Sequence, residues 1–238
     1  MFKQEKIDKQ NLKDIDNLNL GHRIRLRNKF LTSGHHFADY ELLELLLTFS
    51  IPRKDVKPIA KTLLNKFGSI SKILHAEYSD LTEISGIKQN SIVLLKLIKE
   101  FWLFEMHDTL KQSVLLNNYS KLLDYCWLYI AYKNVEQFRI LYLDNNFCLI
   151  DDDLLQEGTI NYAVIYPREV IKHVLSYAAV SVIIVHNHPS GNVEYSKDDL
   201  DITLKIRDAL NTIDVKLLDH IIIGTNKSYF SFKNAGLI

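Results

Sequence analysis

Two histidines, His186 and His188, stand one residue apart at the end of an apolar run, and Asp199 follows shortly downstream. Side chains two apart on a strand point to the same face, so both imidazoles leave the strand end together. Ser196 opens the next helix, whose apolar stripe predicts that Asp199 faces inward. A carboxylate aimed into an apolar layer needs a partner. Two imidazoles and one carboxylate, with a fourth position open, form the ligand set of a catalytic zinc site, so we predict one Zn²⁺ per chain.

Each of these residues also has a structural interpretation. Ser196 and Asp199 have the spacing of a capping box, and a histidine pair at a strand end can simply be hydrogen-bonded. Beside an ion, the Ser196 hydroxyl would also be placed to donate to a developing oxyanion, so it is a candidate catalytic residue. His220 begins another apolar strand and could line the site, but it is interpreted as a core or strand-end histidine.

The segments that position these residues predict a mixed α/β unit. Strands alternating with helices favour a sheet covered by helices on its faces. The expected elements are a helix at 119–131, a hairpin of 138–143 and 147–150, a helix at 169–179, a buried strand at 181–185, a helix at 200–210, and strands at 217–223 and 228–232.

The front half of the chain has a different pattern. Residues 21–106 predict an all-α domain of about five short helices, after a loosely ordered arm at 1–20. Residues 107–118 are expected to be a linker, and 119–238 to form the metal-binding domain. Lysine and arginine outnumber acidic residues in the front half, and the reverse holds behind it, which is consistent either with two units that have different partners or with ordinary solvated surfaces.

Composition excludes several classes of protein. The 47% hydrophobic content supports packed cores, but no apolar run is long enough to cross a bilayer. Cys126 and Cys148 suggest neither a disulfide framework nor a thiolate zinc site, and the N-terminus lacks a signal-peptide pattern. We therefore expect a cytoplasmic protein that does not contact membranes.

Taken together, these residues identify a protein family more specifically than any one of them does. His-x-His, seven residues, then Ser-x-x-Asp matches the JAMM/MPN+ metalloprotease motif at every fixed position, and His-Asn-His-Pro-Ser-Gly resembles the bacterial RadC family, long labelled as DNA repair proteins. Gly158-Thr, Pro167-Arg-Glu-Val and Asp219-His-Ile-Ile-Ile-Gly extend the resemblance over the back half, although Tyr166 stands where the family usually has histidine. The resemblance implies a cytidine-deaminase-like MPN/JAMM fold and a zinc-dependent peptidase or isopeptidase that acts on a protein or peptide.

JAMM enzymes use a glutamate on an upstream strand as general base, and three glutamates are candidates here. Glu136 opens a strand directly after a helix, as the resemblance requires, and is our choice. Glu157, before Gly158-Thr, is the alternative. Glu169 lies in the first turn of a helix, where an acid complements the helix dipole and needs no catalytic explanation.

The front domain resembles a helix-hairpin-helix, which the RadC family carries ahead of its JAMM unit. Such a hairpin presents backbone N–H groups to a phosphate. Gly86-Ile87-Lys88 stands where the motif usually has Gly-Ile-Gly, so the second flexible position is lost and Lys88 would have to compensate as a cation. Gly86 and Lys88 are the candidate DNA contacts, with a basic cluster nearby at 22–29, and a purely structural or protein-contact domain is the alternative. The alternative function is therefore a non-catalytic DNA-binding accessory protein in repair or recombination. A nuclease is disfavoured because the metal site is rich in imidazole. The motifs fix neither the target nor the oligomeric state.

Overall fold

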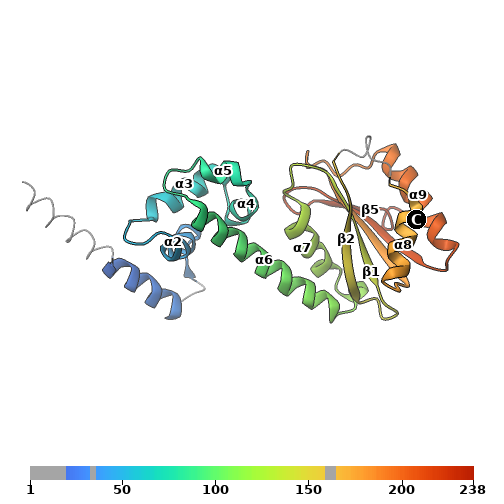
Figure 1. Cartoon of the computed structure of the whole chain (residues 1–238), viewed down its shortest axis with the longest axis horizontal. Helices are drawn as coiled ribbons and strands as arrows, with labels where there is room; N and C mark the ends of the chain where they lie inside the picture. The colour runs from blue at the N-terminus through green and yellow to red at the C-terminus, as the bar shows by residue number, and fades with distance from the viewer. Residues whose placement is uncertain (1–19, 33–35, 159–164) are drawn as a thin grey trace, which may run out of the picture. The chain divides into compact units, whose positions relative to one another are not determined.

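A boundary between Glu100 and Phe101 divides the chain into two units, each with its own hydrophobic core (Figure 1). The structure is a computed structural model and describes residues 20–32, 36–158 and 165–238. Apart from Leu20, which begins a helical segment, the arm expected at 1–20 lies outside the described residues.

The first unit is helical, as the sequence predicted. Local signals set its helix ends: Pro58 occupies the first turn of α3, Gly68 ends that helix with a φ of 86°, and the Ser69 side chain caps α4 by accepting from Lys72 N–H. The helical segments are residues 20–32, α2 (Asp39–Ser50), α3 (Lys57–Phe67), α4 (Ile70–His75), α5 (Tyr78–Thr82) and the first half of α6 (Gln89–Lys111).

The prediction of a linker at residues 107–118 was wrong. Helix α6 runs across the unit boundary to Lys111 and is followed by a 3₁₀ turn, η2 (Leu115–Asn117). Leu110 and Leu115 are each 1% exposed and belong to the core of the second unit. Polar residues around Gln112 and Ser113 mark the end of the helix and not the edge of a domain. None of the helices in the described ranges combines the length and the apolar character that crossing a bilayer requires.

The second unit is built on a five-stranded mixed sheet in the order β2-β1-β3-β4-β5. Only the β3–β4 pair is parallel, and the other neighbours are antiparallel. The strands are β1 (Gln137–Leu143), β2 (Leu149–Glu157), β3 (Ser181–Asn187), β4 (Lys216–Ile223) and β5 (Tyr229–Ser231). The predicted mixed sheet with flanking helices is confirmed.

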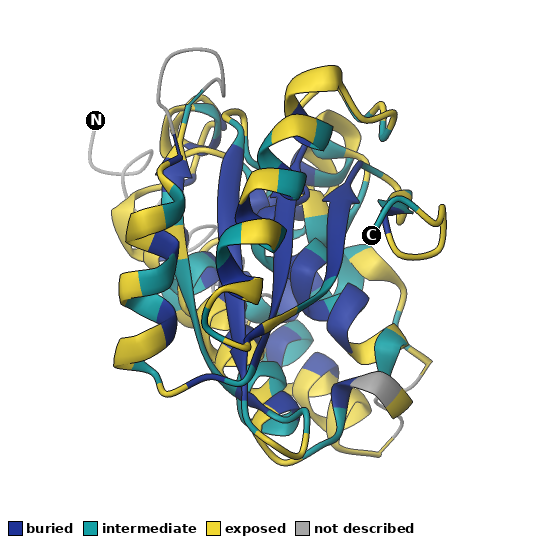
Figure 2. Cartoon of the chain, turned by 90° about the vertical axis from the view of Figure 1, so that its right-hand side faces the viewer, coloured by how far each residue is buried: buried dark blue, intermediate teal, exposed yellow. Residues whose placement is uncertain are grey.

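Helices cover both faces of this sheet, so its central strands are buried (Figure 2). One face packs on α7 (Tyr119–Ile130), and the other on α8 (Pro167–Ser176) and α9 (Lys197–Asn211). In β3, Ile183 and Val185 face α7, whereas Val182 and Ile184 face the other two helices. This alternation continues to the strand end and sets the direction of the residues that follow.

Strand β2 is longer than predicted because it continues through three consecutive aspartates. Asp152 carries a nearly buried carboxylate that forms an ion pair with Arg139 of β1 and accepts from Tyr125 Oη at 2.5 Å. The Arg139 guanidinium lies over the Tyr129 ring. These partners let a strand form where intrinsic propensity disfavours one.

Removal of one member of this buried ion pair should destabilise the second unit strongly. We expect Asp152→Ala to lower its free energy of unfolding by about 3–5 kcal/mol, because the Arg139 charge stays buried without its partner. Both tryptophans, Trp102 and Trp127, lie in this unit, so fluorescence during denaturant unfolding monitors it selectively. Asp151→Ala is the matched control: its side chain is 45% exposed, and its pairing with His107 contributes about 1 kcal/mol or less. An equal loss in both variants would contradict this account.

Candidate metal centre

The end of β3 brings the two histidines of the motif together. His186 is the last but one residue of the strand, and His188 lies just beyond it, held beside β4 because its N–H donates to the Ile223 carbonyl at 3.0 Å. Both rings lie on the α9 side of the sheet, and their Nε2 atoms are 3.0 Å apart. The strand alternation read from the sequence therefore gives the observed direction of both side chains.

Helix α9 supplies the carboxylate. Asp199 and Ser196 form a reciprocal capping box: the Asp199 Oδ2 accepts from the N–H and the hydroxyl of Ser196, each at 2.7 Å, and the Ser196 Oγ accepts from Asp199 N–H. Asp199 Oδ1 is buried, makes no hydrogen bond and lies 3.4 Å from His186 Nε2. Capping and ligation are thus not alternatives, because each uses a different oxygen.

Glu136 is the glutamate that joins this group. It directly precedes β1, and its Oε1 lies 3.8 Å from His186 Nε2 and 4.0 Å from His188 Nε2. Glu157 ends β2 with an exposed side chain, and Glu169 is exposed in the first turn of α8. Ligand atoms of Glu136, His186, His188 and Asp199 all lie within 4.8 Å of one another.

A hydrogen-bonded chain behind His186 sets which ring nitrogen carries its proton. The Thr203 hydroxyl donates to the Asp199 backbone carbonyl, so its oxygen can only accept from His220 Nδ1–H. His220 Nε2 is then an acceptor for His186 Nδ1–H at 2.7 Å, which leaves the His186 Nε2 lone pair facing the site. In the same way, His188 Nδ1 donates to the Asn192 carbonyl at 2.6 Å, and its Nε2 is left for a ligand bond.

Burial favours the neutral form of His186 and His220. Loss of solvation lowers the pKa of His186 to about 4, the nearby His188 acts in the same direction, and Asp199 opposes both. Burial also lowers the pKa of His220 well below its ordinary value. The Nε2 atoms of His186 and His188 lie 3.0 Å apart and point at the same space, an arrangement that a cation between them would stabilise.

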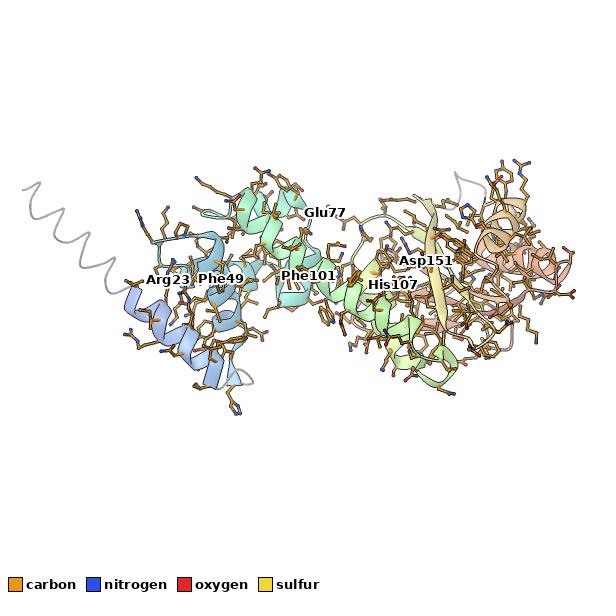
Figure 3. The ribbon with its side chains drawn as sticks, turned by 60° about the horizontal axis from the view of Figure 1, so that its bottom comes forward. Arg23, Phe49, Glu77, Phe101, His107 and Asp151 are labelled. Carbon is orange, nitrogen blue, oxygen red and sulfur yellow. The ribbon has the colours of Figure 1, made fainter. Side chains whose placement is uncertain are left out.

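The donor set fits zinc. Tetrahedral ligands at about 2.0–2.1 Å from the ion lie about 3.3 Å from each other, and the structure has 3.0 Å between the histidine nitrogens and 3.4 Å between His186 Nε2 and Asp199 Oδ1. The described residues contain one other group of ligand types, His107, Asp151 and Asp152. Figure 3 shows His107 and Asp151 together, but Asp152 is the ion-pair partner of Arg139.

The sequence favoured a core or strand-end histidine at position 220, and the structure shows a buried core histidine that also contacts His186. It is fully buried on β4, opposite Ile184 in the parallel register of β3 and β4, where its Nε2 reaches the first ligand. Only the register could have revealed this contact. Ser196 takes its expected N-cap position, but its hydroxyl proton is donated to Asp199, so its role as an oxyanion donor stays a prediction.

In the first unit, Gly86 and Lys88 lie in the turn between α5 and α6, and Lys88 is exposed. Gly86 has a φ of 93°, a backbone conformation that favours glycine, and a Cβ there would also press on the end of the Ile59 side chain at 2.7 Å, so the fold of the turn accounts for this glycine without DNA. DNA contact by these two residues remains a prediction.

Much of the nearby basic cluster is bound within its own unit. Arg23 is buried and donates to the carbonyls of Thr48, Ile51 and Lys54 near the end of α2 (Figure 3). His22 contacts Glu44 at 2.6 Å and Lys29 contacts Glu41 at 2.7 Å. These partners leave fewer free cations for a phosphate backbone than the sequence suggested.

Comparison with known proteins places both units in described families. Residues 116–237 match the model of the RadC-like JAB domain, and residues 19–93 match the UPF0758 N-terminal model. A UPF0758 protein of Fusobacterium nucleatum is 43% identical over 228 residues, covering 92% of this chain and 98% of its own length. A UPF0758 protein of Ruegeria pomeroyi is 40% identical over 218 residues, covering 91% and 97%.

Proposed function

Since this chain belongs to the RadC family, with a RadC-like JAB domain behind a UPF0758 N-terminal domain, we propose that it is a zinc-dependent hydrolase of peptide or isopeptide bonds. The family membership predicted from the motif is confirmed by these matches. A single observation carries the proposed hydrolase activity: a glutamate from outside the motif converges on the three candidate ligand residues.

The convergence supports catalysis more than a purely structural metal site. His186, His188 and Asp199 supply three ligands, whereas structural zinc sites are closed by four. Glu136 Oε1 lies 3.8 Å from His186 Nε2 and 4.0 Å from His188 Nε2, beyond direct hydrogen bonding to either ring, and 15% of the Glu136 side chain is exposed. A zinc ion held by the three ligands would supply Lewis acidity, which activates water near neutral pH and polarises a carbonyl group.

The chain's own residues would then move the proton. The Glu136 carboxylate accepts a proton from the attacking water at Oε1, and water oxygen bonds to the carbonyl carbon. When the C–N bond breaks, the same proton passes to the leaving nitrogen, so a carboxylic acid and an amine are released, and the acid then loses its remaining proton to the amine or to solvent. Ser196 would help stabilise the oxyanion by turning its hydroxyl from Asp199 toward the substrate.

The experiment combines metal content with hydrolysis. We expect full-length protein to contain about one zinc per chain by elemental analysis, and to cleave members of a panel of quenched-fluorescence peptides and isopeptides. Chelation should abolish cleavage, and added zinc should restore it. Protein purified without a chelator that carries no stoichiometric transition metal would contradict the proposal, as would cleavage that persists after the metal is removed.

A further inference from the structure

The residue between the two histidine ligands, Asn187, is fully buried and points away from them. Because β3 alternates its side chains, Asn187 lies on the α7 side of the sheet, with Val185, whereas His186 lies on the α9 side. Its side chain therefore takes no part in ligating an ion. A buried carboxamide needs hydrogen-bond partners, and their identity indicates what this residue does.

Both ends of the carboxamide bind the backbone that leads into β1. Oδ1 accepts from Gln137 N–H at 2.8 Å, and Nδ2 donates to the Val135 carbonyl at 3.1 Å, with the Lys133 carbonyl at 3.5 Å. An N–H must face the oxygen and a carbonyl must face the amide nitrogen, so these partners fix the orientation of the side chain.

These contacts bracket Glu136. One carboxamide holds the peptide group before the Glu136 Cα through the Val135 carbonyl, and the peptide group after it through Gln137 N–H. The Glu136 carbonyl also accepts from Gly158 N–H at 2.8 Å. Because a residue has only two soft backbone dihedrals, holding both flanking peptide planes fixes the conformation of Glu136.

We propose that Asn187 is a positioning residue, which locks the backbone of Glu136 so that its carboxylate stays beside the metal ligands. The catalytic consequence rests on the proposed hydrolase function. His186, Asn187 and His188 then form one rigid segment, whose outer residues hold the ion on one face of the sheet while the middle residue holds the general base from the other face.

The role requires a donor and an acceptor together at asparagine length. Aspartate keeps the acceptor for Gln137 but has no donor for Val135, and leucine has a similar shape with neither group. Without the bracket, Glu136 can shift, and a displacement of about 1 Å at a catalytic group can cost about 100-fold in rate.

The first test uses Asn187→Leu and Asn187→Asp in the full chain, with the peptide that the wild type cleaves best. We expect Asn187→Leu to lower kcat about 100-fold, with zinc content and KM unchanged, and Asn187→Asp to lie between it and the wild type. Val185→Ala is the matched control, since it truncates a buried residue on the same strand and face that does not contact residues 133–137 through hydrogen bonds. An equal loss of kcat in the control would assign the effect to general destabilisation.

A double-mutant cycle shows whether Asn187 acts through Glu136. If it does, Asn187→Leu added to Glu136→Gln lowers kcat no further, because the group that it positions has already lost its function. Additive losses in the two variants would overturn the proposal.

A spectroscopic readout separates this proposal from the proposed function. In the cobalt-substituted full chain, we expect Glu136→Gln to alter the visible absorption bands, Asn187→Leu to produce the same change, and the double variant to add nothing. If the wild type cleaves no peptide, the hydrolase proposal fails, yet this cycle still decides the role of Asn187. Absorption bands that respond to Glu136→Gln but not to Asn187→Leu would refute the positioning role of Asn187.

Discussion

Glu136→Gln should lower kcat for peptide hydrolysis by about 10²–10⁴-fold while the protein keeps its zinc and its fold. Glutamine has nearly the same shape but cannot accept the proton of the attacking water. The carboxylate is placed for this step, with Oε1 3.8 and 4.0 Å from the two histidine nitrogens. Steady-state kinetics on the best-cleaved peptide, with elemental analysis of the same sample, measures both quantities. Because the step removed occurs only in the transition state, KM should change little.

Glu157→Gln is the matched control for this variant. Glu157 is the alternative general base that the sequence offered. It lies opposite Gln137, the residue after Glu136, at the end of β2, and its side chain is exposed. It should retain kcat within about threefold, since exposed groups away from the reacting atoms contribute little to transition-state binding. A large loss in Glu157→Gln with normal Glu136→Gln turnover would reverse the assignment of the base.

Asp199→Asn should lower zinc affinity by at least about 100-fold, since substitution of residues that merely support metal ligands already costs about 10–100-fold. The change removes the anionic oxygen, Oδ1, that has no hydrogen-bond partner, yet it leaves an acceptor for the cap at Ser196. Competition with a chromophoric chelator measures the affinity. The wild type at zinc concentrations 100 times Kd should gain about 2.7 kcal/mol of stability, and the variant should gain much less at the same concentration.

Asp201→Asn serves as the control, because it removes an exposed carboxylate from the same helix and leaves the cap and the site intact. It should bind zinc as the wild type does. If Asp199→Asn also bound zinc normally, the carboxylate would be no more than a helix cap, and the structural interpretation of the motif would be correct.

The sequence by itself determined those features of the site that depend on local geometry. Strand alternation sent His186 and His188 to the same face, and the N-cap signal at Ser196 set the start of α9 and so the direction of Asp199. The apolar stripe of α9 predicted that Asp199 faces inward, and Asp199 is buried on the same helix as Ile206 and Leu210. Such rules need only neighbours in the chain, and they also predicted the helical first unit and the mixed sheet.

Prediction was weaker where long-range partners override local preference. The strand predicted at 147–150 stops before the three aspartates over which β2 continues, residues whose intrinsic propensity disfavours sheet structure. Asp152 remains in the strand since Arg139 and Tyr125 pair with it. Similarly, polar residues near Gln112 suggested a linker, but Leu110 and Leu115 on either side are buried in the second core.

Only the tertiary structure decided which groups surround the ligands. Asn187 reaches Gln137 across a sequence separation of 50 residues, and His186 reaches His220 across 34. Both contacts follow from strand register: Phe138 lies opposite His186, which brings Glu136 to the ligand end of the sheet, and Ile184 lies opposite His220. A shift of one residue would turn those side chains to the other face, and register is set by the packing of the whole sheet. The motif thus indicated the candidate ligands, whereas the fold brings Glu136, and neither of the other two candidate glutamates, beside them and supplies the residues that hold it.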